Sequence, residues 1–322
     1  MKNNRLFKIL VLICILVAAA LYPIVVQRGY YQHLAVMGCI YSLLASSLNL
    51  IVGYTGQLSL GHAAFYGVGA YTSALLTLRL GWPVWAGMLG ATVLAGVFGV
   101  LLGTPTLRLK GSYLVIATLG FGEIVRLVLL NWMSLTRGPM GLTGITRLAP
   151  WAVTKAHYFW VYFPIAVVVV MLLNQLVNSR TGRALKAIRE DQVAAEVMGI
   201  NLAFYKVLAF TVGAVIAGLA GSLYVHYVTF VSPDSFPVAE SIQILVMVIV
   251  GGMGTIAGPI IGAFGIVFLL ETMRALAEYR MVIYGITLFV VIVLMPDGLM
   301  GAVRRVSSIL LQRGVRHAPA GD

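Results

Sequence analysis

One acidic and one basic side chain lie inside the same apolar run of this sequence. Glu123 and Arg126 are three positions apart in the run SYLVIATLGFGEIVRLVLLNW. This spacing places both on one face of a helix, where they can form an ion pair. An unpaired charge at the centre of a membrane costs about 2.5 to 3.5 kcal/mol on insertion scales, and such residues usually face a bundle interior or a cavity. The pair predicts either a structural ion pair or a charged point on a solute path.

A second polar group lies in a glycine-rich stretch. Residues 53–71 have the sequence GYTGQLSLGHAAFYGVGAY, in which five glycines accompany Gln57, Ser59 and His62. Broken backbone is tolerated at membrane depth only where it is buried in protein or lines a cavity. The sequence is compatible with a water-filled path and with tight packing. Our candidates for a translocation path or gate are Asn49, Gln57, Ser59, His62, Glu123 and Arg126.

A second glycine-rich segment repeats part of this spacing. Residues 251–265 have the sequence GGMGTIAGPIIGAFG, and an offset of 198 aligns three of its glycines with glycines of the first segment. Corresponding interruptions in two halves are typical of internally duplicated transporters. The segment also approximates a dinucleotide-binding glycine pattern, but it lacks the soluble strand-helix context which that pattern requires.

Catalytic and metal sites are not predicted. His62 and His226 lie singly in apolar surroundings and are expected to be packed or interfacial groups. No His, Cys, Asp and Glu spacing matches a metal site, and no nucleophile and base can be paired from the order of residues. We therefore expect a protein that is not an enzyme and has no cofactor of its own.

The composition places most of the chain in lipid. Its 322 residues are 60% hydrophobic and only 10% charged, with a mean hydropathy of +0.97, whereas soluble domains carry about 25% charged residues. The net charge of +12 comes from short connections between apolar runs. Basic residues collect there on the cytoplasmic side of membrane proteins. We therefore expect a lipid bilayer around the chain and no nucleic-acid partner.

The apolar runs predict an all-α, polytopic integral membrane helical bundle of about ten spans with broken helices, forming one transmembrane domain over residues 1–322. A span needs about 20 apolar residues. The predicted spans are 8–26, 33–53, 62–80, 84–103, 112–133, 157–178, 206–227, 240–252, 259–276 and 282–296. The runs 240–252 and 259–276 are also compatible with one bent helix.

The basic residues predict the orientation. With both termini in the cytoplasm, 14 of the 22 Lys and Arg residues lie in cytoplasmic segments and 7 in outer segments or at outer span ends, which is the expected bias. Residues 104–111, 179–205 and 297–322 are then cytoplasmic, and 134–156 form the longest outer loop. The break after Gly53 is expected at the cytoplasmic end of the second and third spans, where it could act as a hinge or gate.

The long cytoplasmic segment 179–205 contains a predicted short helix. Its sequence is SRTGRALKAIREDQVAAEVMGINLAFY. Asp191 can cap a helix over 192–198 by accepting the free N–H groups of its first turn, and Gly199 can supply the left-handed residue that ends it. We expect Ala194 and Ala195 on the surface of this helix, where small side chains permit close approach of another protein. A solvated loop is the alternative.

These motifs resemble those of a known family. The run GRALKAIREDQVAAEVMGIN resembles the coupling loop of ABC importer permeases, and SSLNLIVGYTG and LTRGPMGLTGI resemble the LivM-type permease subunits of branched-chain amino acid importers. The resemblance runs from about residue 46 to 298. It implies that a nucleotide-binding subunit is contacted by Arg183, Asp191, Ala194, Ala195 and Gly199. The alanine pair follows Glu190 and Asp191 at a distance, which departs from the general coupling pattern.

The resemblance also implies the partners and the location. The partners are a second, LivH-like permease subunit in a heterodimer, two ATP-binding subunits and a periplasmic substrate-binding protein that delivers ligand to loop 134–156. The chain has no Gly-Lys dipeptide and therefore no phosphate-binding G-x-x-x-x-G-K-[ST] loop. ATP must then be bound by the partner subunits. The expected location is the bacterial inner membrane.

Two classes of function follow. The favoured class is a permease subunit that forms the translocation path for leucine, isoleucine and valine, where Glu123 and Arg126 could face a zwitterionic cargo. Urea, short amides or other small polar solutes are alternative cargoes. The rival class is an ion-coupled secondary transporter that uses Glu123 as its coupling carboxylate and works without ATPase partners.

Overall fold

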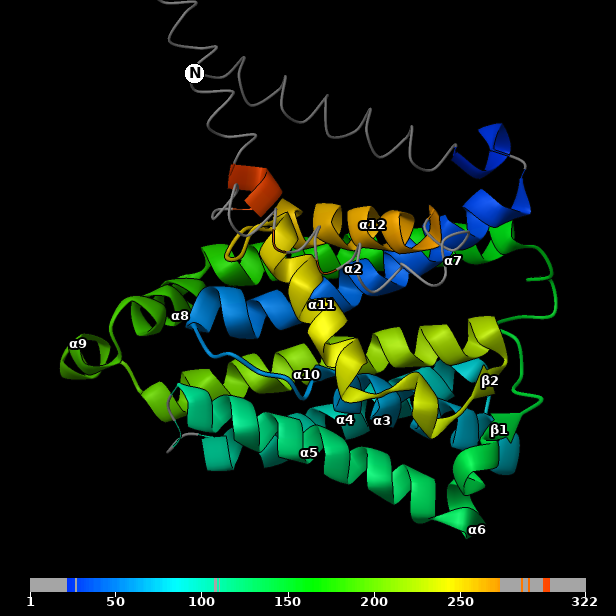
Figure 1. The fold of residues 1–322 in the computed structure, drawn as a ribbon, viewed down its shortest axis with the longest axis horizontal. Coiled ribbons are helices and arrows are strands. Elements are labelled where there is room, and N and C mark those ends of the chain that lie inside the picture. The colour runs from blue at the N-terminus through cyan, green and yellow to red at the C-terminus, as the bar shows by residue number, and fades with distance from the viewer. Residues whose placement is uncertain are drawn as a thin grey trace, which may run out of the picture.

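The chain folds as an all-helical bundle in which most long helices run side by side (Figure 1). The computed structural model describes residues 22–26, 28–106, 109, 111–272, 285, 289 and 298–301. Most of the predicted spans 8–26 and 282–296, and most of the segment 297–322, lie outside the described residues. Six helices of the described part are long and apolar enough to cross a membrane, and the chain is a multi-pass membrane protein.

The eight principal helices match the eight predicted spans that fall on described residues. They are α2 (Gly29–Thr55), α3 (His62–Arg79), α4 (Val84–Thr106), α5 (Ser112–Asn131), α7 (Lys155–Asn178), α10 (Leu202–Val228), α11 (Val238–Gly251) and α12 (Ala257–Thr272). Runs 240–252 and 259–276 therefore form two helices and not one bent helix. Polar capping residues fix some boundaries. Asn201, for example, accepts a hydrogen bond from the N–H of Phe204 and begins α10.

Short elements mark the two ends of the bundle. At one end, which we call the α9 end, lie α8 (Arg180–Glu190) and α9 (Gln192–Val197). At the other, the β end, lie α6 (Met133–Thr136), η1 (Gly138–Met140) and β1 (Leu142–Thr143), which pairs antiparallel with β2 (Phe230–Val231). A further short helix, η2 (Pro233–Ser235), follows β2. The loop 134–156 is therefore ordered by turns and strand pairing.

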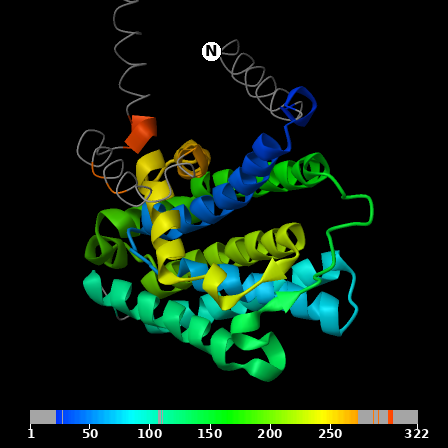
Figure 2. The same ribbon diagram turned by 45° about the vertical axis from the view of Figure 1, so that its right-hand side comes forward.

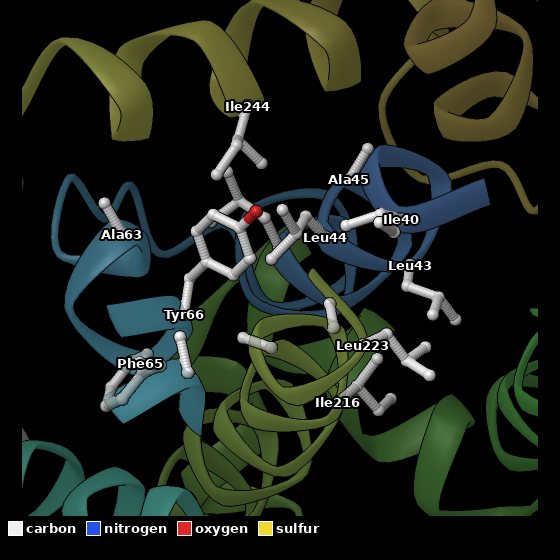
Figure 3. Close-up of a cluster of buried hydrophobic side chains, with 14 of the residues drawn as sticks. Ile40, Leu43, Leu44, Ala45, Ala63, Phe65, Tyr66, Ile216, Leu223 and Ile244 are labelled. Carbon is white, nitrogen blue, oxygen red and sulfur yellow. The ribbon is translucent and has the colours of Figure 1, made fainter. Parts of the chain in front are cut away.

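α2 is the central helix of the bundle. Its apolar window is 89% buried, compared with 17% for α5. It packs against α12, α10, α7 and α11, and its side chains Ile40, Leu43 and Leu44 face the core beside Tyr66 of α3 (Figure 3). α5 lies at the periphery (Figure 2) and presents most of its surface to the surroundings.

Glycines bring three helices into backbone contact. α10 packs closely on α4 and α3. A Cβ atom at Gly69 of α3 would overlap the backbone of Gly218 in α10, and one at Gly221 would overlap the backbone of Tyr66. On the other face of α10, a Cβ at Gly218 would overlap Ala95 of α4. Small residues at helix interfaces permit this close approach and are typical of membrane bundles.

Candidate functional site

The first helix break connects α2 to α3 and runs into the bundle. Gly56 ends α2 with a φ of 71°, a left-handed conformation that glycine adopts without strain. The chain then turns back before α3 begins at His62, whose Nε2 lies 2.7 Å from Oγ of Ser47. Ser47 lies about two turns before the end of α2. The expectation that this break lies at one end of two spans is therefore wrong for α3, which begins inside the bundle.

Side chains from other helices satisfy the backbone groups that this break exposes. The N–H of Leu60 donates to Oγ1 of Thr118 in α5 at 3.0 Å, and the N–H of Ala63 donates to Oγ of Ser241 in α11 at 2.9 Å. Ser59 and His62 are fully buried, and Gln57 accepts a hydrogen bond from Thr55. The break is thus packed in this conformation, although Nε2 of Gln57 and Nδ1 of His62 are buried and have no hydrogen-bond partner within the described part of the chain.

The second break, Gly252–Ile256 between α11 and α12, is held by Asn49. The side-chain amide of Asn49 donates to the carbonyl of Thr255 and accepts from the N–H of Gly254, both at 2.8 Å. Asn49 is buried near the end of α2. Both polar groups of its amide are therefore engaged in positioning this turn in the observed conformation.

The last turn of α2, directly before the first break, touches the second break, and Arg189 contacts both of them and also Gly56 in the first break. Gly53 packs so tightly on Gly254 that a Cβ on Gly53 would overlap the backbone N of Gly254. Arg189 in the last turn of α8 donates from Nη1 to the carbonyl of Gly53, and the same Nη1 lies so close to Gly254 that a Cβ atom added there would overlap it. Sequence reasoning missed Arg189, because its partner is 136 positions away in the chain.

The starts of α3 and α11 meet in the interior of the bundle. Besides the bond from Ala63 to Ser241, Glu240 in the first turn of α11 accepts a hydrogen bond from the hydroxyl of Tyr41 at 2.7 Å. Sequence reasoning missed Glu240 because it is the first residue of the predicted span 240–252, where a charge would lie at the membrane surface. Tyr41 lies near the middle of α2, so Glu240 is deep in the bundle.

Glu123 and Arg126 form the predicted ion pair on α5. Their side chains are 2.7 Å apart, with relative exposures of 36% for Glu123 and 25% for Arg126. Arg126 also lies 3.9 Å from Asp234 of η2. The pair is thus on the peripheral helix α5, and its partner from outside that helix, Asp234, lies in η2 and not in either break. His226 is packed as expected, with its ring nitrogens next to Ser73 and the carbonyl of Thr146.

α8 and α9 project at the α9 end of the bundle (Figure 1). Oδ1 of Asp191 accepts hydrogen bonds from the N–H groups of Val193 and Ala194, and Gly199 follows the helix with a φ of 82°. The predicted cap and helix end are therefore confirmed. Ala194 is exposed, but Ala195 is only 4% exposed. The expectation that both alanines lie on the surface is wrong for Ala195, because that side of α9 packs on the bundle.

The exposed side of α9 carries apolar side chains. Val197 and Met198 are 81% and 82% exposed, and Val193 is exposed beside Ala194. Arg183 is exposed on α8. We call Val193, Ala194, Val197 and Met198 the α9 surface. Apolar residues exposed together outside the predicted spans indicate an interaction site.

Comparison with known proteins supports a transport role for this arrangement. Residues 30–292 match the family described as branched-chain amino acid transport system / permease component. The chain is 38% identical to the high-affinity branched-chain amino acid transport system permease protein LivM of Salmonella typhimurium and 37% identical to that of Escherichia coli, in each case over 92% of this chain and 75% of the relative. It is 27% identical to permease protein LivH of Escherichia coli, over 82% of this chain and 92% of the relative. No solved structure matches the chain.

Proposed function

The chain belongs to the permease family of branched-chain amino acid transport systems, and from this we propose that it forms part of the path for leucine, isoleucine and valine in an ABC importer. In this proposal the energy comes from ATP hydrolysis on separate subunits. The observation that carries the proposal is the projecting helix pair α8 and α9. α9 carries an exposed apolar surface, and α8 carries Arg189, which contacts Gly53 and Gly254 at the helix breaks.

The α9 surface is the proposed contact with an ATP-binding subunit. Val193, Val197 and Met198 offer apolar area, and Ala194 is small enough for the partner to approach closely. Asp191 and Gly199 fix the start and the end of α9. Arg183 is exposed on the preceding helix, where it can pair with an acidic group of the partner. Ala195 supports α9 from its buried side.

Arg189 supports a route from this surface into the bundle. It lies in the last turn of α8, directly before Asp191 and α9, and its guanidinium contacts Gly53 and Gly254. A displacement of α9 by the ATP-binding subunit then pulls on both breaks at once. We infer that Gln57, Ser59 and His62 belong to a gate that is closed in this conformation, with Asn49 holding the second break.

The second permease subunit of the LivH type is proposed to pack against the peripheral helices and complete the path. α5 offers an exposed apolar face with Glu123 and Arg126 on it. A charged pair that is partly exposed on an otherwise apolar helix favours a protein or aqueous neighbour over lipid. The binding protein is proposed to dock on the loop 134–156, in which β1 pairs with β2. Inner-membrane location, with both termini cytoplasmic, belongs to the same proposal.

Substitutions on α9 are expected to uncouple the transporter. Ala194→Trp adds bulk at the proposed contact, and Gly199→Asp adds a Cβ at a left-handed position, which costs about 1–2 kcal/mol. We expect each to reduce uptake about tenfold or more while the permease still inserts, because a contact made by a two-turn helix tolerates little misplacement. Uptake and co-purification of the ATP-binding subunits measure the effect.

The matched control is Ala203→Trp. Ala203 is also exposed and lies near α9 at the start of α10, so this variant places the same bulk outside the α9 surface. Normal uptake and normal co-purification of the ATP-binding subunits in both α9 variants would contradict the docking proposal.

The cargo is tested by uptake in a deletion strain that keeps the cognate binding protein. We expect loss of labelled leucine uptake, with urea uptake unchanged, and restoration of leucine uptake by the plasmid-borne chain. Unchanged leucine uptake in the deletion strain overturns the proposed cargo, and loss of urea uptake assigns the chain to small amides instead.

A further inference from the structure

Glu240 places a carboxylate deep in the membrane-spanning bundle. Its Oε1 accepts a 2.7 Å hydrogen bond from the hydroxyl of Tyr41, and Tyr41 lies near the midpoint of α2 (Gly29–Thr55), a helix long enough to cross a membrane. Carboxylates at this depth are costly and mark substrate or ion paths. The depth of Glu240 therefore calls for a positively charged or strongly polar partner.

The described residues do not supply a positively charged partner for the Glu240 carboxylate. Among the residues that the structure describes, no Lys or Arg forms an ion pair with Glu240. A buried charge without an opposite charge is unfavourable. Glu240 and Tyr41 are both partly exposed, so the pair lies at the edge of the packed core.

Aromatic side chains surround this position from the buried side. The rings of Tyr66 and Tyr224 have centroids 5.4 Å apart, and Phe236 lies edge-on to Tyr66 at 5.0 Å. Glu240 is close enough to Tyr66 and Tyr224 to act on them electrostatically. Carboxylates and aromatic rings together recognise cationic nitrogen, the rings through their negative faces.

A hydroxyl group in this cluster has no partner among the described residues. It belongs to Tyr66, whose side chain is only 2% exposed. Figure 3 shows this hydroxyl pointing between Leu44 of α2 and Ile244 of α11, and Ile244 is one turn beyond Glu240. Because buried polar groups are almost always hydrogen-bonded, this orphan hydroxyl is a second, independent sign of a missing ligand.

We propose that Glu240, with the hydroxyls of Tyr41 and Tyr66, binds the primary ammonium group of the cargo inside the membrane. This inference rests on the proposed function, since leucine, isoleucine and valine carry such a group. The carboxylate accepts hydrogen bonds from the ammonium N–H groups, and a tyrosine oxygen accepts another. Urea and neutral amides cannot supply this positive charge, so the site favours amino acids over those solutes.

The competing role is a plain hydrogen bond that joins α2 to α11. The two roles predict opposite results for two variants. Glu240→Gln keeps an oxygen that accepts from Tyr41 but removes the charge. Tyr41→Phe removes the hydrogen bond but keeps the charge. A structural bond is more sensitive to Tyr41→Phe, and an ammonium site is more sensitive to Glu240→Gln.

The test uses the complete transporter, with its own ATP-binding subunits, second permease and binding protein, in proteoliposomes. We expect Glu240→Gln to lower the leucine uptake rate about tenfold or more, since charge-assisted hydrogen bonds are about twice as strong as neutral ones. The melting temperature should match the wild type, and Tyr41→Phe should lower uptake less than Glu240→Gln.

Glu271→Gln is the control for removing a carboxylate from the bundle. Glu271 lies in the last turn of α12, outside the aromatic cluster, and its variant should retain normal uptake. Wild-type uptake by Glu240→Gln overturns the ammonium site, as does a lower melting temperature with a proportionate loss of uptake. If the wild-type transporter itself carries no leucine under these conditions, the result refutes the proposed cargo. That outcome is distinct from a failure of the ammonium site, in which the wild type still carries leucine.

Discussion

Gly69→Ala is expected to prevent the bundle from reaching its native packing, although the substitution adds only one methyl group. Gly69 of α3 faces Gly218 of α10 so closely that a Cβ would overlap backbone atoms, which cannot rotate out of the way as a side chain can. Overpacking a core with flexible neighbours costs about 1–3 kcal/mol, and we expect a larger cost here because two helices must separate. Gly221→Ala, which meets the backbone of Tyr66, should have a similar effect.

The measurement is the yield and melting temperature of the protein extracted in detergent, with Gly120→Ala as the matched control. Gly120 lies in the interior of α5, and a Cβ there has nothing within 4 Å. Alanine is favoured over glycine in a helix by about 1 kcal/mol, so the control should retain or gain stability. Equal melting temperatures for Gly69→Ala and Gly120→Ala would show that α3 and α10 are not in backbone contact.

Arg189→Met is expected to separate ATP hydrolysis from transport. Methionine keeps an unbranched apolar stem for packing but loses the guanidinium that donates to the carbonyl of Gly53 and contacts Gly254. A hydrogen bond from a charged group contributes about 1.5–3 kcal/mol, which corresponds to a factor of about ten or more in an equilibrium. We therefore expect uptake per ATP hydrolysed to fall about tenfold, while the ATP-binding subunits still bind.

The control for this variant is Arg180→Met in the first turn of α8. Arg180 is exposed, and its substitution removes the same charge from the same helix without touching either break. Both variants are compared in proteoliposomes by leucine uptake and phosphate release under identical conditions. If Arg189→Met transports as much leucine per ATP as Arg180→Met does, the route from α9 through Arg189 to the breaks is refuted.

Part of the candidate site is local in sequence, and that part could be predicted. Asp191 caps α9 by accepting hydrogen bonds from the N–H groups two and three residues later in the chain. Glu123 pairs with Arg126 within one helical turn. Gly199 has the left-handed conformation expected of a helix-ending glycine. Each of these features depends on neighbours fixed by helical geometry, so the residue types and their spacing were sufficient.

Other residues of the site were missed or misplaced, because their environment is made by distant helices. Asn49 bonds to Thr255 across 206 positions, and Tyr41 bonds to Glu240 across 199. The hydropathy pattern placed Glu240 at a membrane surface, because a charged residue next to an apolar run is expected to mark the end of a span. It cannot reveal that α11 begins inside the bundle. Ala195 faces the bundle and not a partner, because this side of α9 packs on the bundle.

The sequence by itself determined that this is a helical membrane protein, where its described helices lie and which family it belongs to, because hydropathy and motif order are properties of the chain. Only the tertiary structure decided that the last turn of α2 touches the break after Gly251, that Arg189 contacts both, and that Glu240 lies beside Tyr41 at mid-depth. The physical reason is that helix packing is set by side-chain volume at contacts between distant segments, where one missing Cβ decides how closely two backbones approach.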